Sequence, residues 1–171
     1  MTAGVVVWIT GLPSAGKSTF AERLRVALRA LELDACVLDG DAVRDCLVPA
    51  PGYSADERAD FYETLARLAA LLAKQEMIVL VPATAHRRAF RQRARALAPR
   101  FLEVWVATPL ADCQVRDTKG LYAGSRSGQA LNVPGVDEEY EPPSNADVVA
   151  RGGTDAEAVA EVVAQLRTRN V

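Results

Sequence analysis

The sequence predicts an α/β protein with a mainly parallel five-stranded sheet and helices on both faces. Short apolar, β-branched runs alternate with helical patterns from one end of the 171 residues to the other. Such alternation implies crossover connections, which join parallel strands. The length is that of one ordinary domain. We therefore expect a single domain over residues 1–171.

The expected elements follow from these alternating patterns. The strands are 5–10, 35–38, 77–81, 101–107 and 146–150, and the helices are 18–31, 56–74, 87–97, 110–116 and 155–167. The helix over 56–74 repeats Leu65, Leu68 and Leu72 at helical spacing. Residues 117–143, here named the lid segment, are irregular and rich in Gly, Ser, Pro and charge. A stretch of this length inside a compact domain is typical of a lid or a disordered segment.

Composition excludes several classes of protein. Half of the residues are hydrophobic and a quarter are charged, as in globular proteins. The formal charge of −2 gives no basic field for a nucleic acid. The first residues lack the basic flank and cleavage site of a signal peptide, and no apolar run has membrane-spanning length. Cys36, Cys46 and Cys113 form no close pair, so we expect reduced thiols and a cytoplasmic location.

A phosphate-binding motif follows the first strand. Residues 11–19, here named the phosphate loop, read GLPSAGKST and have the P-loop spacing between a strand and a helix. Its glycines let successive N–H groups turn toward phosphate oxygens, and the start of the helix adds its positive end. We expect Lys17 to reach the β- and γ-phosphates and Ser18 to bind Mg²⁺. The expected ATP-binding residues of the loop are Gly11, Ser14, Ala15, Gly16, Lys17, Ser18 and Thr19. The fold class is then the three-layer P-loop NTPase fold.

Two aspartates follow the second strand, at the end that faces the phosphate loop. Asp39 can hold the waters of Mg²⁺, and Asp41 can accept a hydroxyl proton during phosphoryl transfer. In the alternative interpretation, Asp41 is only the N-cap of a short helix. Arg44, about one turn beyond Asp41, can bind an anionic acceptor through its planar guanidinium.

The sequence resembles the adenosine 5′-phosphosulfate (APS) kinase family. The resemblance rests on the phosphate loop, on residues 39–44, 52–54 and 58, and most specifically on residues 101–106, 108–110, 113, 116–117, 119–122, 135–137 and 140–143. It implies a cytoplasmic enzyme that transfers a phosphoryl group from MgATP to the 3′-hydroxyl of APS, giving 3′-phosphoadenosine 5′-phosphosulfate. It also implies a homodimer and a mobile lid.

The resemblance also implies roles for individual residues. The catalytic residues are Lys17, Asp41 and Asp39, with Asp39 supporting the metal through water. Asp41 and Arg44 would contact the acceptor, Tyr53 would replace a Phe that packs on its adenine, Arg58 would bind its anionic group, Lys119 would close the lid, and Arg116 would lie near the ATP base.

The chain departs from the family on the acceptor side. Ala85 replaces a Ser after the third strand, Phe61 replaces an Asn, and Val133 replaces a Phe of the lid. Thr84 is expected to point away from the position of the lost hydroxyl, because the chain there is expected to be extended. Either Tyr53 and Phe61 supply the aromatic contacts of an APS kinase in another way, or the acceptor is a different nucleotide or sugar. A third hypothesis is that the chain is a non-catalytic nucleotide-binding partner of a sulfurylase.

Several other residues are interpreted as structural. His86 is interpreted as a surface or hydrogen-bonded residue. The basic run from Arg87 to Arg95 is interpreted as a solvated helix face, within which Arg88 matches an Arg of the family. Trp8 and Trp105 are predicted to be core residues. Leu65, Leu68 and Leu72 are expected in the core or in a dimer interface.

Overall fold

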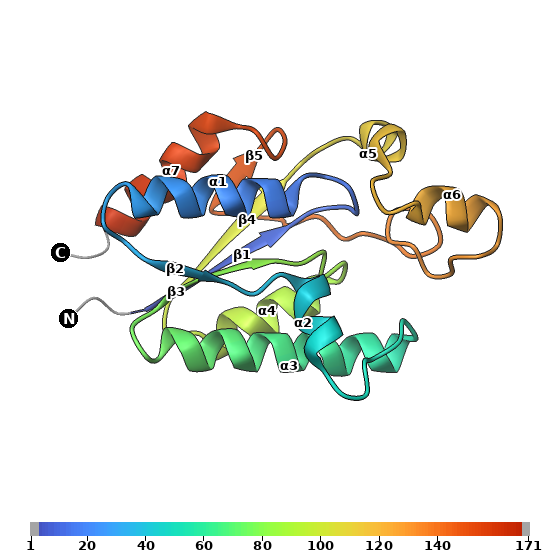
Figure 1. The fold of residues 1–171 in the computed structure, drawn as a ribbon, viewed down its shortest axis with the longest axis horizontal. Helices are drawn as coiled ribbons and strands as arrows, with labels where there is room; N and C mark the ends of the chain where they lie inside the picture. The colour runs from blue at the N-terminus through green and yellow to red at the C-terminus, as the bar shows by residue number, and fades with distance from the viewer. Residues whose placement is uncertain (1–3, 169–171) are drawn as a thin grey trace.

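A five-stranded, all-parallel sheet forms the centre of the molecule (Figure 1). The structure, a computed structural model, describes residues 4–168. The strands are β1 (Val5–Thr10), β2 (Ala35–Val37), β3 (Ile78–Pro82), β4 (Phe101–Val106) and β5 (Val148–Ala150). Their order is β2-β3-β1-β4-β5, and every neighbouring pair is parallel. The predicted fold class is therefore confirmed.

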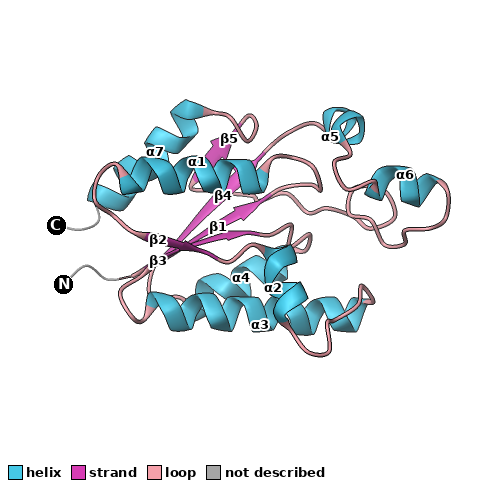
Figure 2. Ribbon diagram, viewed as in Figure 1, coloured by secondary structure: helices cyan, strands magenta, loops and turns pink. Residues whose placement is uncertain are grey.

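Helices cover both faces of this sheet (Figure 2). Helices α1 (Lys17–Arg29) and α7 (Ala156–Thr168) lie on one face, and α3 (Ala55–Ala73) and α4 (Arg88–Leu97) lie on the other. Three short helices, α2 (Gly40–Cys46), α5 (Leu110–Arg116) and α6 (Leu121–Arg126), lie beyond the carboxyl ends of the strands. In open α/β sheets this is the end at which ligands bind. Among residues 4–168, no helix has the length and apolar character needed to cross a membrane.

Strand β1 divides the core into two layers. Its side chains alternate across the sheet, so that Val7 and Ile9 join the cluster under α1 and α7 while Val6 and Trp8 join the cluster over α3. Trp8 is fully buried, as predicted. Trp105 is only half-buried and belongs to neither core cluster, so its prediction as a core residue is wrong.

Helix α2 begins at a different aspartate from the one considered in the sequence. The N-cap is Asp39, whose Oδ1 accepts hydrogen bonds from the backbone N–H groups of Asp41 (3.0 Å) and Ala42 (3.5 Å). Asp39 has extended backbone angles, as an N-cap requires. The reading of Asp41 as the N-cap is therefore wrong, and its carboxylate is not engaged in capping.

Two side chains are buried: Arg91, which is predicted to lie on a solvated helix face, and His86, which is interpreted as a surface or hydrogen-bonded residue. Arg91 is 2% exposed and donates to Glu103 Oε1 (2.7 Å), Ala85 O (2.5 Å) and Glu141 O (2.6 Å), so the basic helix is not simply a solvated face. His86 is also 2% exposed. Burial, with the nearby Arg58 as a second cause, lowers the pKa of His86 to about 4, so its imidazole is neutral.

Candidate active site

One cavity of about 610 Å³ lies at the carboxyl ends of the strands. The phosphate loop, the start of α2, the first turns of α3 and residues 118–134 of the lid segment line it. The predicted site residues that line it are Ser14, Gly16, Lys17, Ser18, Thr19, Asp41, Arg44, Tyr53, Arg58, Phe61, Arg116, Lys119 and Val133. Gly11, Ala15 and Asp39 are not among its lining residues. Residues predicted for donor and acceptor thus share one space.

The phosphate loop has the backbone that the motif predicts. Gly16, the N-cap of α1, has φ of 102°, a conformation that side-chain-bearing residues rarely adopt. A Cβ at this position would lie 2.9 Å from the backbone of Gly153, so only glycine fits. The N-terminus of α1 faces the cavity and provides N–H donors and a positive dipole end for phosphate oxygens.

Lys17 and Ser18 line the end of the cavity that is predicted to bind the donor. Lys17 Nζ donates to the carbonyl oxygen of Leu12 at 2.7 Å, which folds the side chain over the phosphate loop. Ser18 Oγ donates to Asp39 Oδ2 at 2.7 Å. The serine and the aspartate therefore present two oxygens side by side, and hard oxygen ligands are what Mg²⁺ prefers.

The amine of Lys17 is poorly hydrated. Its burial, with the charge of Lys119 as a second cause, lowers the pKa of Lys17 to about 7. Above that pH the amine of the free protein loses its proton, and a negatively charged nucleotide must then bind together with a proton. We expect the dissociation constant of MgATP to be flat below pH 7 and to rise by up to about tenfold per pH unit above it.

Calorimetric titration of MgATP between pH 6 and 9 measures this dependence. Lys17→Met is the matched control, because it keeps the apolar stem and cannot titrate; only the titration of the nucleotide itself remains in this variant. Equal pH profiles for the wild type and Lys17→Met would contradict the assignment.

Two arginines and two aromatic rings form the end of the cavity that is predicted to bind the acceptor. The guanidinium carbon of Arg44 lies 4.4 Å from the ring centre of Tyr53 and 4.0 Å from that of Phe61. Arg44 Nη1 also donates to the carbonyl oxygens of Pro51 (2.9 Å) and Gly52 (2.7 Å). Phe61 therefore supports Arg44 through a cation–π contact. Tyr53 and Phe61 thus both contact Arg44, and their contact with a base of the acceptor stays a prediction.

Arg58 is the second cation of this end. It is 7% exposed, and Arg58 Nη2 donates to Asn132 O at 2.5 Å. Its desolvation lowers its pKa. Buried cations with carbonyl partners favour an anionic ligand, because a negative charge would offset their lost hydration.

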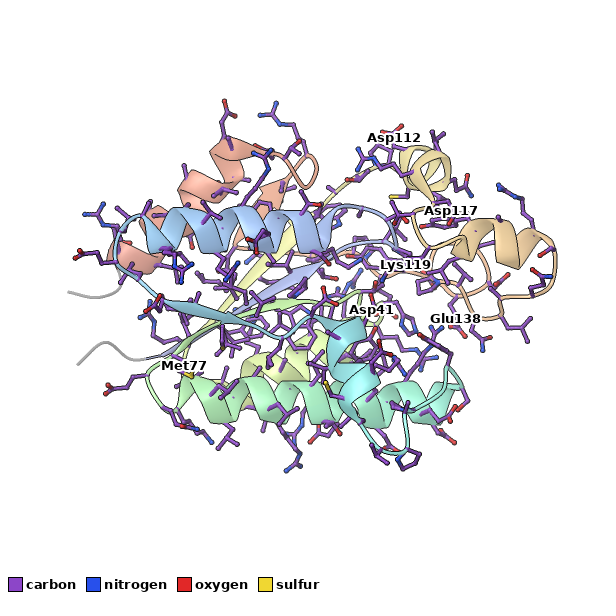
Figure 3. All side chains as sticks on the ribbon, in the orientation of Figure 1. Asp41, Met77, Asp112, Asp117, Lys119 and Glu138 are labelled. Carbon is purple, nitrogen blue, oxygen red and sulfur yellow. The ribbon has the colours of Figure 1, made fainter. Side chains whose placement is uncertain are left out.

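The lid segment contributes lining residues to the cavity and contacts α2 and the loop that precedes α3. Lys119 forms an ion pair with Asp41, and Figure 3 shows the two side chains directed toward one another. Asn132 Nδ2 donates to Tyr53 O at 3.3 Å, and the hydroxyl groups of Thr118 and Ser14 lie 3.3 Å apart. Helix α6 lies inside this segment, which the sequence predicts to be irregular throughout.

The sequence misses several residues of the cavity. Thr84 lines it, contrary to the expectation that it points away. Ala85 has φ of 39°, so the chain is not extended there, and the Ala85 N–H donates to the hydroxyl of the cavity-lining Tyr62 at 3.0 Å. The backbone oxygen of Asn132 accepts a hydrogen bond from Arg58, and its side-chain amide donates to the backbone oxygen of Tyr53. The only local signal for Asn132 in the sequence is that it is a polar residue next to Val133 in the lid segment.

His86 and Val133 differ in their relation to the cavity. His86 is not among the residues that line the cavity; its Nε2 lies 3.9 Å from Glu138 Oε2. Val133 lines the cavity and also packs in the core cluster under α1, 3% exposed. Val133 therefore fixes the lid segment to the body of the protein.

The fold and the site together define a kinase of the P-loop class. A parallel sheet of order 2-3-1-4-5 carries the phosphate loop on its central strand, and Arg44 and Arg58 line the same cavity as this loop. The sequence model of the family described as "Adenylylsulphate kinase" matches residues 3–151. The chain belongs to the adenylylsulphate kinase family.

Relatives and solved structures agree with this membership. The chain is 41% identical over 163 residues to the adenylyl-sulfate kinase of Microcystis aeruginosa, covering 95% of this chain and 89% of the relative. It is 42% identical over 163 residues to a probable adenylyl-sulfate kinase of Synechocystis sp., covering 95% of this chain and 91% of the relative. Among solved structures, the APS kinase CysC of Mycobacterium tuberculosis in complex with AMPPNP and APS has a TM-score of 0.90 at 36% identity, over 98% of this chain and 99% of that one.

Proposed function

We propose that this kinase transfers the γ-phosphoryl group of MgATP to the 3′-hydroxyl of APS, giving ADP and 3′-phosphoadenosine 5′-phosphosulfate. The observation that carries the proposal is the shared cavity, which is lined by the phosphate loop and by Asp41, Arg44 and Arg58. One end suits the phosphates of a nucleotide, and the other suits a planar base with an anionic group. Catalysis is then mainly positioning and charge neutralisation.

The phosphate loop and its neighbours bind the donor. Lys17 leaves Leu12 O to bind the β- and γ-phosphates, the loop amides hold the other phosphate oxygens, and Arg116 lies beside the base. The pair formed by Ser18 and Asp39 suits Mg²⁺, with Ser18 as a direct ligand and Asp39 acting through water. When bound, the ion neutralises charge on the β- and γ-phosphates.

Asp41 acts at the point of transfer. The acceptor's 3′-oxygen attacks the γ-phosphorus while the bond to the β–γ bridging oxygen breaks, and the hydroxyl proton passes to the Asp41 carboxylate. In the present structure Lys119 neutralises that carboxylate. The acceptor hydroxyl replaces Lys119 as the partner of Asp41, which frees the lysine for phosphate oxygens.

The acceptor binds between α2, α3 and the lid segment. Arg44 and Arg58 bind its anionic group, and Tyr53, which is 55% exposed, offers a ring for its base. Phe61 and Val133 add apolar contact. The lid segment, as it closes, keeps water from the γ-phosphate and so suppresses ATP hydrolysis.

We further propose that the chain acts in the cytoplasm as a homodimer, as the family resemblance implies. Leu68 and Leu71 on α3 are 36% and 56% exposed, and a second subunit would cover apolar surface of this kind. A sulfurylase, which would supply APS, is the proposed functional partner. Sedimentation equilibrium measures the subunit number.

The test of the function is a coupled assay of ADP release with MgATP at several concentrations of APS. We expect saturable, APS-dependent turnover and a 3′-phosphorylated product. Binding of ATP without APS-dependent turnover would contradict the acceptor and mark Phe61, Ala85 and Val133 as the determinants of another one. A panel of nucleotides and sugars then separates a kinase for a different acceptor from a non-catalytic nucleotide-binding subunit.

A further inference from the structure

We infer that Thr108 is a positioning residue for ATP: its hydroxyl group holds the carbonyl of Ala15 and so keeps the amides of the phosphate loop turned toward the nucleotide. The inference rests on the proposed binding of the ATP phosphates in this loop. Thr108 follows β4, far from the loop in sequence. Thr108 Oγ1 donates to Ala15 O at 2.7 Å, and the residue is 5% exposed.

The direction of the Ala15 carbonyl determines that of the next amide. In a trans peptide the C=O and the following N–H point to opposite sides. Ala15 is not among the residues that line the cavity, whereas Gly16 lines it. With the Ala15 carbonyl held on the side of Thr108, the Gly16 N–H is directed to the opposite side, where the cavity lies.

The phosphate loop requires such support because its backbone is strained. Ser14 has φ of 60°, which lies in the left-handed region. A residue other than glycine keeps that conformation only when its surroundings hold it. Thr108 provides the shorter of two side-chain contacts to Ala15 O, since Arg116 Nη1 lies 3.5 Å from the same oxygen.

Thr108 is itself firmly placed. Its carbonyl oxygen accepts the thiol of Cys113 at 3.7 Å, and the next residue but one begins α5. Gly153, in the turn that follows β5, packs against Gly16. The contact is so close that a Cβ added to Gly153 would lie 2.4 Å from the carbonyl oxygen of Gly16. The Thr108 hydroxyl therefore acts on the phosphate loop from a firmly placed residue.

The test compares Thr108→Val with Thr108→Ser. Valine keeps the branched shape but leaves the Ala15 carbonyl without its hydroxyl partner, whereas serine keeps the hydroxyl. We expect Thr108→Val to raise the MgATP dissociation constant and KM about 5- to 30-fold, as loss of a buried hydrogen bond predicts. The KM for APS should change less than about twofold, and Thr108→Ser should recover most of the MgATP affinity.

Thr10→Val is the matched control. The Thr10 hydroxyl is also buried and donates to a backbone carbonyl, Thr84 O at 2.7 Å, on the acceptor side of the cavity. Thr10→Val should lower the melting temperature as Thr108→Val does, without a comparable effect on MgATP binding. Calorimetric titration of MgATP needs no acceptor, so this result does not depend on whether APS is phosphorylated.

Three outcomes would overturn the inference. The first is a MgATP dissociation constant in Thr108→Val within twofold of the wild type. The second is failure of Thr108→Ser to recover affinity. The third is a parallel rise in KM for both substrates, which would make Thr108 a residue of general structural importance only.

Discussion

Replacement of Lys17 by alanine should lower kcat by about 10²- to 10³-fold or more, because it removes a preorganised cation from the phosphate oxygens of the transition state. The protein should remain folded. The lowered pKa of Lys17 shows that the fold disfavours its charged form. Loss of this amine therefore removes an unfavourable contribution to the free energy of folding. We expect an unchanged or higher melting temperature together with the loss of turnover.

Lys74→Ala is the control for this variant, since Lys74 is an exposed residue at the end of α3. It should retain full turnover. Steady-state assays and thermal melts of both variants give the comparison. Turnover in Lys17→Ala within tenfold of the wild type would refute the donor mechanism.

Asp41→Asn should separate turnover from ATP affinity. Asparagine keeps the shape of the side chain but cannot take the acceptor's proton, so kcat should fall by about 10²- to 10⁴-fold. The MgATP dissociation constant should change by less than about threefold, because the donor contacts remain. The fold should be little affected. Asp39, not Asp41, caps α2, and the exposed ion pair with Lys119 is worth only about 0–1 kcal/mol.

The control for Asp41 is Asp45→Asn, one turn further along α2 and exposed. Its kcat should match that of the wild type. Rates from single-turnover experiments and affinities from calorimetry distinguish the two roles. An equal loss of kcat and of ATP affinity in Asp41→Asn would show an aspartate that shapes the site without taking part in transfer.

Local patterns were sufficient for most of the fold. Each of the ten predicted helices and strands ends within two residues of its observed bounds. These elements carry their own signals, such as the β-branched run of β1 and the capping box of α3 from Ser54 to Glu57. Helix α6 was missed because Leu121–Arg126 is short and contains Gly124, which lowers helix propensity.

The site could be predicted only where its geometry is local. The phosphate loop is one continuous motif, so its residues could be named. The burial of Arg91 depends on Glu103, on β4, and on Glu141, in the loop before β5, and the helical pattern of α4 contains no trace of them. The position of Thr84 likewise depends on the positive φ of Ala85, which a non-glycine residue does not signal.

The hydrogen bonds of Arg91 also determine which part of the chain can move relative to the sheet. Arg91 Nη2 holds Glu141 O, and Tyr140 Oη lies 3.0 Å from Thr10 Oγ1 at the end of the central strand. From Tyr140 onward the backbone is thus fastened to the sheet. A hinge on this side would have to lie before Tyr140, and we expect displacement of the chain before that residue to open the route by which ADP and the sulfonucleotide product depart.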